Sequence, residues 1–234
     1  MDSRTFSGEE LWIESATAEL EAAAERARFE GRGSLSLCLA GGRTPEPVYR
    51  AMAARSLPGF SVELWLGDER AVAAGQADRN DAMIERAFAH CAWERAPRLH
   101  PWPLDLPAAA EAAAAQAAAS ARLYDAELRA SLGDEPAFDL AILGLGADGH
   151  TASLFPGEAA LDSASGALAA VTRSPLPPRM RLTLTPRALR QARRRLFLVR
   201  GADKLPALRA LEAEDPAIPA SLLAGPGSLV LYLK

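Results

Sequence analysis

Lysine is almost absent from this chain, and the scarcity makes one position easy to notice. Only two of the 26 basic residues are lysines, Lys204 and Lys234. Because nearly every other cation is an arginine, a single arginine is weak evidence of function, whereas Lys204 carries more weight. Acidic residues outnumber basic ones, and the net charge is −4. This balance argues against a general nucleic-acid binder, which needs a basic stripe to displace counterions, but a local cluster could still bind a small anion.

Cysteines are also scarce, and a long apolar run is missing. Cys38 and Cys91 lack the spacing of a zinc site and the density of a disulfide scaffold, so we expect reduced thiols. No apolar stretch reaches 18 residues, and residues 1–30 do not read as a signal sequence. The sequence therefore predicts a cytoplasmic protein with neither a membrane nor a nucleic acid as partner.

The 234 residues, 49% of them hydrophobic, predict one α/β domain spanning residues 1–234. Segments with strand character alternate with helical ones, which predicts a doubly wound, mostly parallel, Rossmann-like sheet with helices on both faces. Ser7 is expected to cap the first helix, and Thr44 to cap a helix that has Pro45 at its first position. The expected strands cover 35–39, 62–66, 138–145, 181–185, 196–199 and 229–233, and the expected helices 9–30, 80–89, 106–132, 187–192 and 203–213.

The first polar loop after a strand is Gly41-Gly42-Arg43-Thr44. Two glycines let the backbone approach a ligand closely, a following helix points free N–H groups at it, and Arg43 adds a forked donor for phosphate. The loop lacks the lysine of a P-loop and the glycine spacing of a dinucleotide fingerprint, so it supports neither ATP nor NAD. An ordinary tight turn before a capped helix is the alternative.

Two further loops carry charge or histidine. Gly67-Asp68-Glu69-Arg70 follows an apolar strand and is either a solvated turn or part of a crevice. The loop 144–151 contains His150, whose imidazole is the side chain best suited to take a proton from water near neutral pH. Asp148 could orient it. No further metal ligands cluster there, which favours metal-free acid–base chemistry.

The other two histidines have structural explanations. His90 is expected within a helix and His100 beside Pro101, as surface or packing residues.

Two cations elsewhere could close an anion pocket. Arg181 opens a short strand, and Lys204 follows another; a guanidinium fork and an ammonium complement each other on one phosphate.

These motifs resemble the 6-phosphogluconolactonases, within a superfamily that also contains glucosamine-6-phosphate deaminases and ribose-5-phosphate isomerases. The middle motif is the most specific, because a deaminase is expected to continue after Asp-Gly-His toward Asn-Glu-Pro. The motifs that carry the resemblance are Gly-Gly-Arg-Thr-Pro at 41–45, Trp-Leu-Gly-Asp-Glu-Arg at 65–70, Asn80, Leu-Gly-Leu-Gly-Ala-Asp-Gly-His-Thr-Ala-Ser-Leu-Phe-Pro at 143–156, Arg-Leu-Thr-Leu-Thr at 181–185, Gly201 with Lys204, and Pro-Ala-Ser at 219–221.

The resemblance implies hydrolysis of 6-phospho-D-glucono-1,5-lactone to 6-phosphogluconate in the oxidative pentose phosphate pathway, without cofactor or metal, by a monomer or weak homodimer. The implied catalytic residues are His150 as general base, with Asp148 beside it, and Arg70 near the ring. The implied substrate-binding and phosphate-binding residues are Gly41, Gly42, Arg43, Thr44, Asp68, Asn80, Arg181 and Lys204.

The sequence departs from the family pattern at Ala40 and Arg79, where serines are usual, and at Ala73, where proline is frequent. Two rival functions remain open. An isomerase or deaminase would use Asp68 to move a proton between adjacent carbons. A non-catalytic sugar-phosphate sensor would normally carry a helix-turn-helix, whereas the 40 residues before the glycine turn are expected to hold only one helix and a strand.

Overall fold

The structure is a computed structural model that describes residues 1–104, 110–161 and 166–234. A parallel sheet of seven strands forms its centre, in the order β1-β10-β9-β6-β2-β3-β5, and this confirms the doubly wound α/β fold. The strands are β1 (Asp2–Phe6), β2 (Ser34–Leu39), β3 (Ser61–Leu66), β5 (Arg98–His100), β6 (Leu140–Gly144), β9 (Arg195–Arg200) and β10 (Ser228–Leu233).

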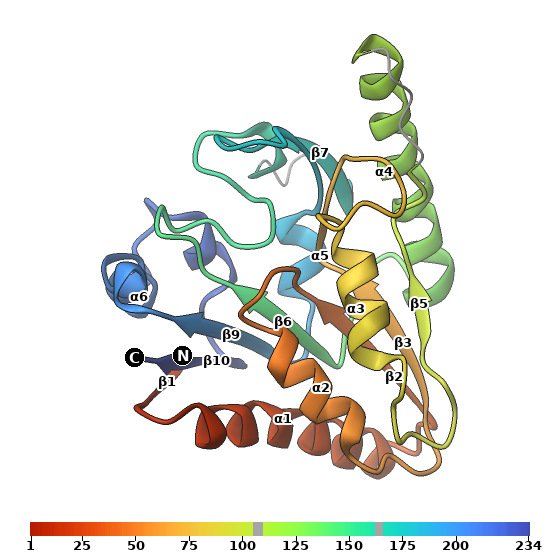
Figure 1. Ribbon diagram of the computed structural model, residues 1–234, viewed down its shortest axis with the longest axis vertical. Helices are drawn as coiled ribbons and strands as arrows, with labels where there is room; N and C mark the ends of the chain where they lie inside the picture. Colours follow the sequence, from red (N-terminus) through yellow and green to blue (C-terminus); the bar gives the residue numbers. More distant parts are fainter. Residues whose placement is uncertain (105–109, 162–165) are drawn as a thin grey trace.

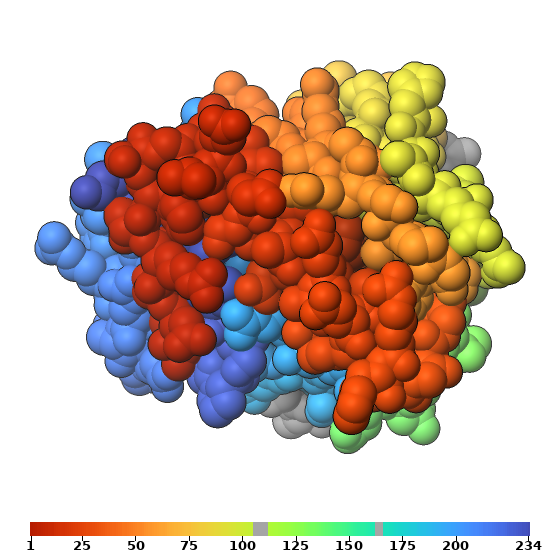
Figure 2. Space-filling model, turned by 90° about the horizontal axis from the view of Figure 1, so that it is seen from below, coloured from red at the N-terminus to blue at the C-terminus, as the bar shows by residue number. Residues whose placement is uncertain are grey.

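Helices lie on both sides of this sheet. In Figure 1, α1 and α2 run below it, whereas α4 and α5 lie on the other side. Figure 2 shows α1, in red, spread across the lower face. The helix predicted over 106–132 is described from Ala110 onward, and its predicted start lies outside the described residues. The helices are α1 (Glu9–Phe29), α2 (Glu46–Ala54), α3 (Asn80–Phe88), α4 (Ala110–Leu132), α5 (Pro186–Arg190) and α6 (Leu205–Glu212), with short 3₁₀ turns at Ala159–Leu161, Ala202–Lys204 and Pro219–Leu223.

The core lies between these helices and the sheet. Strands β2, β6, β9 and β10 are buried along most of their length, as expected for parallel strands covered on both faces. The Trp12 indole N–H of α1 donates to the Leu231 carbonyl of β10 at 2.9 Å and so fixes the helix on the sheet. No helix in the described part of the chain is long and apolar enough to cross a membrane.

A second sheet was not expected. It is antiparallel, with the order β4-β8-β7, and contains β4 (Asp68–Arg70), β7 (Ala169–Arg173) and β8 (Met180–Leu184). The prediction that 181–185 belongs to the parallel sheet is therefore wrong. So is the reading of the charged run at 67–70 as a solvated turn: the backbone of Asp68–Arg70 pairs with β8, and the Glu69 side chain is fully buried.

Both predicted helix caps are also wrong. The structure starts α1 after Gly8 and α2 after Pro45, and neither helix has a side-chain capping bond. Ser7 lies one residue too early for its helix, and Pro45 occupies the position that was expected for Thr44. The first turn of α1 is instead acidic, which complements the positive end of the helix dipole.

The strand order places a topological switch point between β2 and β6. From β2 the chain moves outward to β3, whereas from β6 it later moves to β9 on the opposite side. Loops that leave β2 and β6 at their carboxyl ends therefore diverge and leave a crevice between them, which is where ligands bind in open α/β sheets. These are the loops that begin at Ala40 and at Leu145.

Candidate active site

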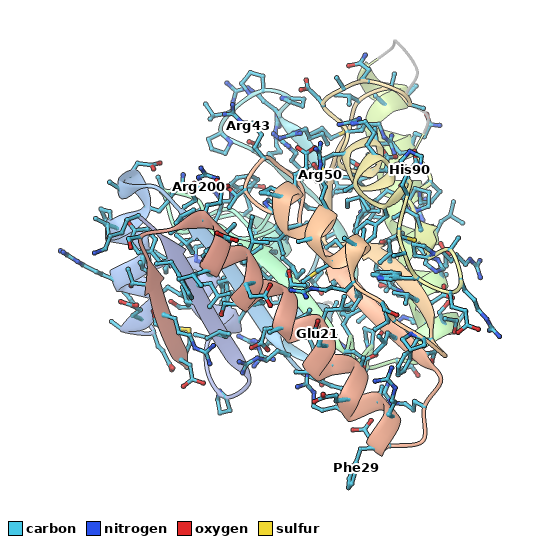
Figure 3. All side chains as sticks on the ribbon, turned by 60° about the horizontal axis from the view of Figure 1, so that its bottom comes forward. Glu21, Phe29, Arg43, Arg50, His90 and Arg200 are labelled. Atoms are coloured by element: carbon cyan, nitrogen blue, oxygen red, sulfur yellow. The ribbon has the colours of Figure 1, made fainter. Side chains whose placement is uncertain are left out.

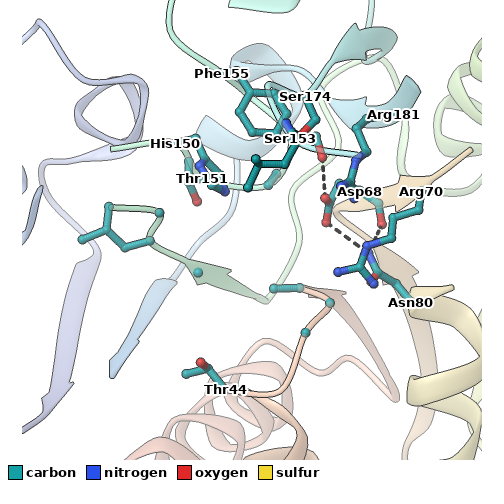
Figure 4. Close-up of a pocket in the computed structure, with 18 of the residues that line it drawn as sticks. Thr44, Asp68, Arg70, Asn80, His150, Thr151, Ser153, Phe155, Ser174 and Arg181 are labelled. Carbon is teal, nitrogen blue, oxygen red and sulfur yellow. Dashed lines mark hydrogen bonds between the residues drawn. The ribbon is translucent and has the colours of Figure 1, made fainter. Parts of the chain in front are cut away.

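A cavity of about 760 Å³ lies at this switch point. Its walls come from the segments that follow β2, β4, β6 and β9, and from the second sheet (Figure 4). The structure brings every site residue predicted from the sequence to this one cavity. Those residues are Gly41, Gly42, Arg43, Thr44, Asp68, Arg70, Asn80, Asp148, His150, Arg181 and Lys204.

The glycine loop packs directly against the start of α3. A Cβ atom at Gly41 would lie 1.9 Å from Asn80 Oδ1, so no larger residue fits unless Asn80 moves. Gly42 adopts a φ of +93°, in the left-handed region that favours glycine. The side chain of Arg43 is exposed. The backbone of the loop thus faces the cavity, and the contact with Asn80 limits how close the loop can come to α3.

His150 and Asp148 form a hydrogen-bonded pair in the loop after β6. Asp148 Oδ1 lies 2.5 Å from His150 Nδ1 and also accepts the His150 backbone N–H at 3.2 Å. The His150 side chain is one-third exposed, and the Phe155 ring lies 4.7 Å from it, centroid to centroid. A Cβ at Gly146 would lie 2.1 Å from His150 Nδ1, so this close arrangement requires glycine there.

Electrostatics around this pair favour a charged carboxylate. Partial burial alone would raise the pKa of Asp148, but the backbone N–H and the imidazole of His150 outweigh this and lower it. A carboxylate on Nδ1 fixes which nitrogen carries the proton. We assign the proton to Nδ1, which leaves Nε2 as the basic nitrogen.

Asp68 occupies the opposite wall and links three loops. Its Oδ2 accepts the Ser153 hydroxyl at 2.6 Å, and its backbone carbonyl accepts the Asn80 amide at 2.9 Å. Burial raises the pKa of Asp68, and this rise is opposed by the Ser153 hydrogen bond and by the positive charge of Arg181. The loop that carries His150 is thereby tied to β4 and to α3.

Arg70 and Arg181 face each other across the second sheet. They are directly paired in the register of β4 and β8, and Figure 4 shows both near Asp68. Burial, with a smaller contribution from Arg70, lowers the pKa of Arg181. Among the described residues, no carboxylate forms an ion pair with either guanidinium; Arg181 Nε donates to the Pro178 carbonyl at 2.9 Å. Two like charges opposite each other are unfavourable and favour an anionic ligand between them.

Two further cations line the cavity, one at the end of β9 and one in the 3₁₀ turn that follows it. Lys204 Nζ lies 3.0 Å from Asp203 Oδ2, and Arg200 pairs with Glu9 at 2.6 Å. Figure 3 shows Arg43 and Arg200 on the upper side of the molecule, far from the end of α1 that Phe29 marks. The cavity thus combines five cationic side chains with the Asp68 and Asp148 carboxylates and a third acidic lining residue, Asp78.

Sequence reasoning missed several cavity residues. Ser153 and Phe155 belong to the motif that signalled the family, but their contacts with Asp68 and His150 depend on how the loop closes. Arg200 had no signal because arginines are so common here. The proline-rich segment at 174–178 also lines the cavity, and composition alone indicated only a loop.

The other histidines have structural roles or none. His100 is buried, stacks on Trp65 with ring centroids 3.7 Å apart, and contacts Glu63 and Glu127, which agrees with the packing role expected for it. His90 is exposed and lies just after α3 rather than within it. Both cysteines are free. Within the described ranges, no group of three or more His, Cys, Asp or Glu residues could hold a metal ion.

Comparisons with known proteins agree with this architecture. Residues 8–231 match the family model described as glucosamine-6-phosphate isomerases/6-phosphogluconolactonase. The chain is 36% identical to a 6-phosphogluconolactonase of Synechocystis sp. over 86% of this chain and 82% of that protein. It is 26% identical to a structure of a 6-phosphogluconolactonase from Shewanella baltica, with a TM-score of 0.82 over 100% of this chain and 98% of that one. A structure of the Trypanosoma brucei 6-phosphogluconolactonase gives 26% identity and a TM-score of 0.81 over 99% and 95%.

Proposed function

The chain belongs to the glucosamine-6-phosphate isomerase/6-phosphogluconolactonase family, and we propose that it hydrolyses 6-phospho-D-glucono-1,5-lactone to 6-phosphogluconate. The observation that carries this proposal is the Asp148–His150 pair, which lines the same cavity as a set of cationic side chains. We also propose that the chain forms a single domain over 1–234, that it is cytoplasmic, and that it is a monomer or weak homodimer.

Binding starts at the phosphate. Gly42, Arg43 and Thr44 offer backbone and side-chain donors from the glycine loop, and Arg181 and Lys204 add charge from other walls. Lys204 is already paired with Asp203, so a dianionic phosphate would compete with that carboxylate. Holding the substrate by its far end positions the lactone carbonyl, and the binding energy is used for orientation.

His150 acts as general base. Nε2 takes a proton from a water molecule as the water oxygen attacks the lactone carbonyl carbon, and the carbonyl oxygen becomes negatively charged. Asp148 stabilises the imidazolium that forms and holds the ring in place through Nδ1. The tetrahedral intermediate then breaks its bond to the ring oxygen, which takes the proton back from Nε2. The products are a carboxylic acid and a free hydroxyl.

We assign Arg70 as the donor to the developing oxyanion. Its guanidinium lines the cavity beside Asp68 and Arg181, and one of its nitrogens donates to the Asp78 carbonyl. Donors held in advance by the protein stabilise such a charge better than water does, because they need no reorganisation during the reaction. Asp68 and Asn80 complete the wall and are the groups available to the sugar hydroxyls.

A coupled assay tests the proposal. Freshly generated 6-phosphogluconolactone is supplied, 6-phosphogluconate is detected with its dehydrogenase, and the spontaneous rate is subtracted. Hydrolysis well above that rate, lost in His150→Ala, supports the lactonase. A second arm supplies glucosamine 6-phosphate; turnover there, dependent on Asp68, would favour the deaminase instead. Binding of the phosphorylated sugar without turnover in either arm would favour a sensor.

A further inference from the structure

Glu69 lies in the middle of β4 but does not face the cavity. Alternation along the strand sends Asp68 and Arg70 to the cavity, and Glu69 to the opposite side. Its side chain is fully buried, whereas Asp68 and Arg70 are partly exposed. A buried carboxylate is costly unless hydrogen-bond donors compensate it, so its partners indicate why it is there.

Three backbone N–H groups donate to this carboxylate. Oε1 accepts the N–H of Arg70 at 2.7 Å and that of Asn80 at 2.8 Å, and Oε2 accepts the N–H of Asp81 at 3.0 Å. Asn80 and Asp81 are the first two residues of α3. Glu69 therefore satisfies helix donors that have no partner within the helix, from a strand eleven residues earlier in the chain.

The residue next to α3 does not supply this cap itself. Arg79 occupies the N-cap position and makes no side-chain capping bond. Its guanidinium is buried and binds Asp81 Oδ1 at 3.0 Å, with weaker bonds to the Val72 and Leu104 carbonyls at 3.4 and 3.3 Å. A guanidinium has no acceptor atom, so Arg79 cannot accept the helix N–H groups. Asp81 Oδ1 accepts the N–H of Ala82 at 2.6 Å, and Glu69 accepts the first two, those of Asn80 and Asp81.

Glu69 is hydrogen-bonded to two cavity residues, Arg70 and Asn80, and Asn80 in turn contacts a third, Gly41. Arg70 and Asn80 line the cavity, and the Asn80 amide sits where a Cβ of Gly41 would be. The carboxylate thus links β4 to the start of α3, and Asn80 lies against the glycine loop. We propose that Glu69 is a positioning residue that holds Arg70 and Asn80 in register with the glycine loop. This inference rests on the proposed lactonase reaction.

Glu69→Gln tests it, because the amide keeps the shape but replaces one acceptor oxygen with a donor that faces a backbone N–H. Glu94→Gln is the matched control, since Glu94 Oε2 also accepts a backbone N–H, from Gly59 at 2.9 Å, but lies outside the cavity. We expect the kcat/KM of Glu69→Gln to fall roughly tenfold to a hundredfold with a raised KM, and that of Glu94→Gln to stay within twofold. Circular dichroism monitors folding.

The KM separates positioning from stability. A smaller folded fraction lowers the apparent kcat and leaves KM unchanged, so a lowered kcat with an unchanged KM would overturn the proposal. Wild-type kinetics in folded Glu69→Gln would also overturn it. If Glu69→Gln does not fold, Glu69→Asp, which keeps the carboxyl group but shortens the reach to α3, takes its place. Failure of both to fold would assign Glu69 to stability alone.

Titration calorimetry with inorganic phosphate distinguishes the two proposals. If the parent protein does not hydrolyse the lactone, the proposed function fails, but the positioning role still predicts weaker phosphate binding in Glu69→Gln than in Glu94→Gln. Equal phosphate affinity in these two variants would count against positioning, whatever the parent protein hydrolyses.

Discussion

Gly146→Ala is expected to separate the side chain of His150, the proposed general base, from that of Asp148, its hydrogen-bond partner. The added methyl would lie 2.1 Å from His150 Nδ1 and 2.6 Å from Asp148 Oδ1, the two atoms that form their hydrogen bond. Gly146 does not have a positive φ, so alanine brings no left-handed backbone strain there. The perturbation therefore acts on the position of the base rather than on the conformation of the loop.

The size of the effect follows from these distances. Side-chain contacts to a Cβ are essentially never shorter than 3.0 Å, so the imidazole must shift by roughly 1 Å. A misplacement of that size costs about a hundredfold in rate, or about 2.7 kcal/mol of transition-state stabilisation. Affinity for the phosphate should change little, because the glycine loop belongs to a different strand.

The coupled lactone assay measures this prediction, with Gly8→Ala as a control. Gly8 has no neighbour within 4 Å of its added Cβ and does not line the cavity, so its variant should match the parent. A kcat for Gly146→Ala within about threefold of the parent value would refute the assignment of this pair as the base, since a required imidazole cannot tolerate that shift.

Three other outcomes are expected. His150→Ala should lower kcat roughly 10²- to 10⁴-fold, the usual loss for a general base, with phosphate binding by calorimetry nearly unchanged. Arg43→Ala and Lys204→Ala should mainly raise KM for the phosphorylated lactone; a variant that still discriminated against unphosphorylated gluconolactone as well as the parent would lose its assigned role. Burial raises the pKa of Glu69 from 4.5 to about 7, so the folded protein retains a proton that the unfolded chain releases, and stability should fall by up to roughly 3 kcal/mol as pH rises from 4.5 to 7. Chemical unfolding of Glu69→Gln across that range should show a flatter profile.

The parallel sheet could be predicted because its strands have a strong local signal. Buried parallel strands are mostly apolar, and short segments rich in apolar residues marked the positions of β2, β3, β6, β9 and β10. Edge and short strands lack that signal. β1 is mostly exposed, β5 has only three residues, and β7 mixes buried and exposed positions, so no run of apolar residues indicated them.

Site residues on loops after parallel strands could be predicted for the same reason. Once β2 and β6 are recognised, topology brings Gly41 and His150 to one crevice without knowledge of any side-chain contact. Side-chain contacts within the crevice could not be predicted in this way. The bond from Ser153 to Asp68 joins residues 85 positions apart, and only the closed loop shows it.

Composition and local pattern could not predict which side chains of the charged run in β4 face the cavity. Asp68, Glu69 and Arg70 are three consecutive charges, and composition does not tell which of them faces a ligand. The antiparallel register with β8 decides it, because pairing Arg70 with Arg181 turns both guanidiniums to the cavity and sends Glu69 to α3. A slip of one residue would put Glu69 in the cavity and bury Arg70 against the helix amides. The cationic character of this wall therefore depends on strand register, and the buried bonds of Glu69 to α3 stabilise the register that is observed.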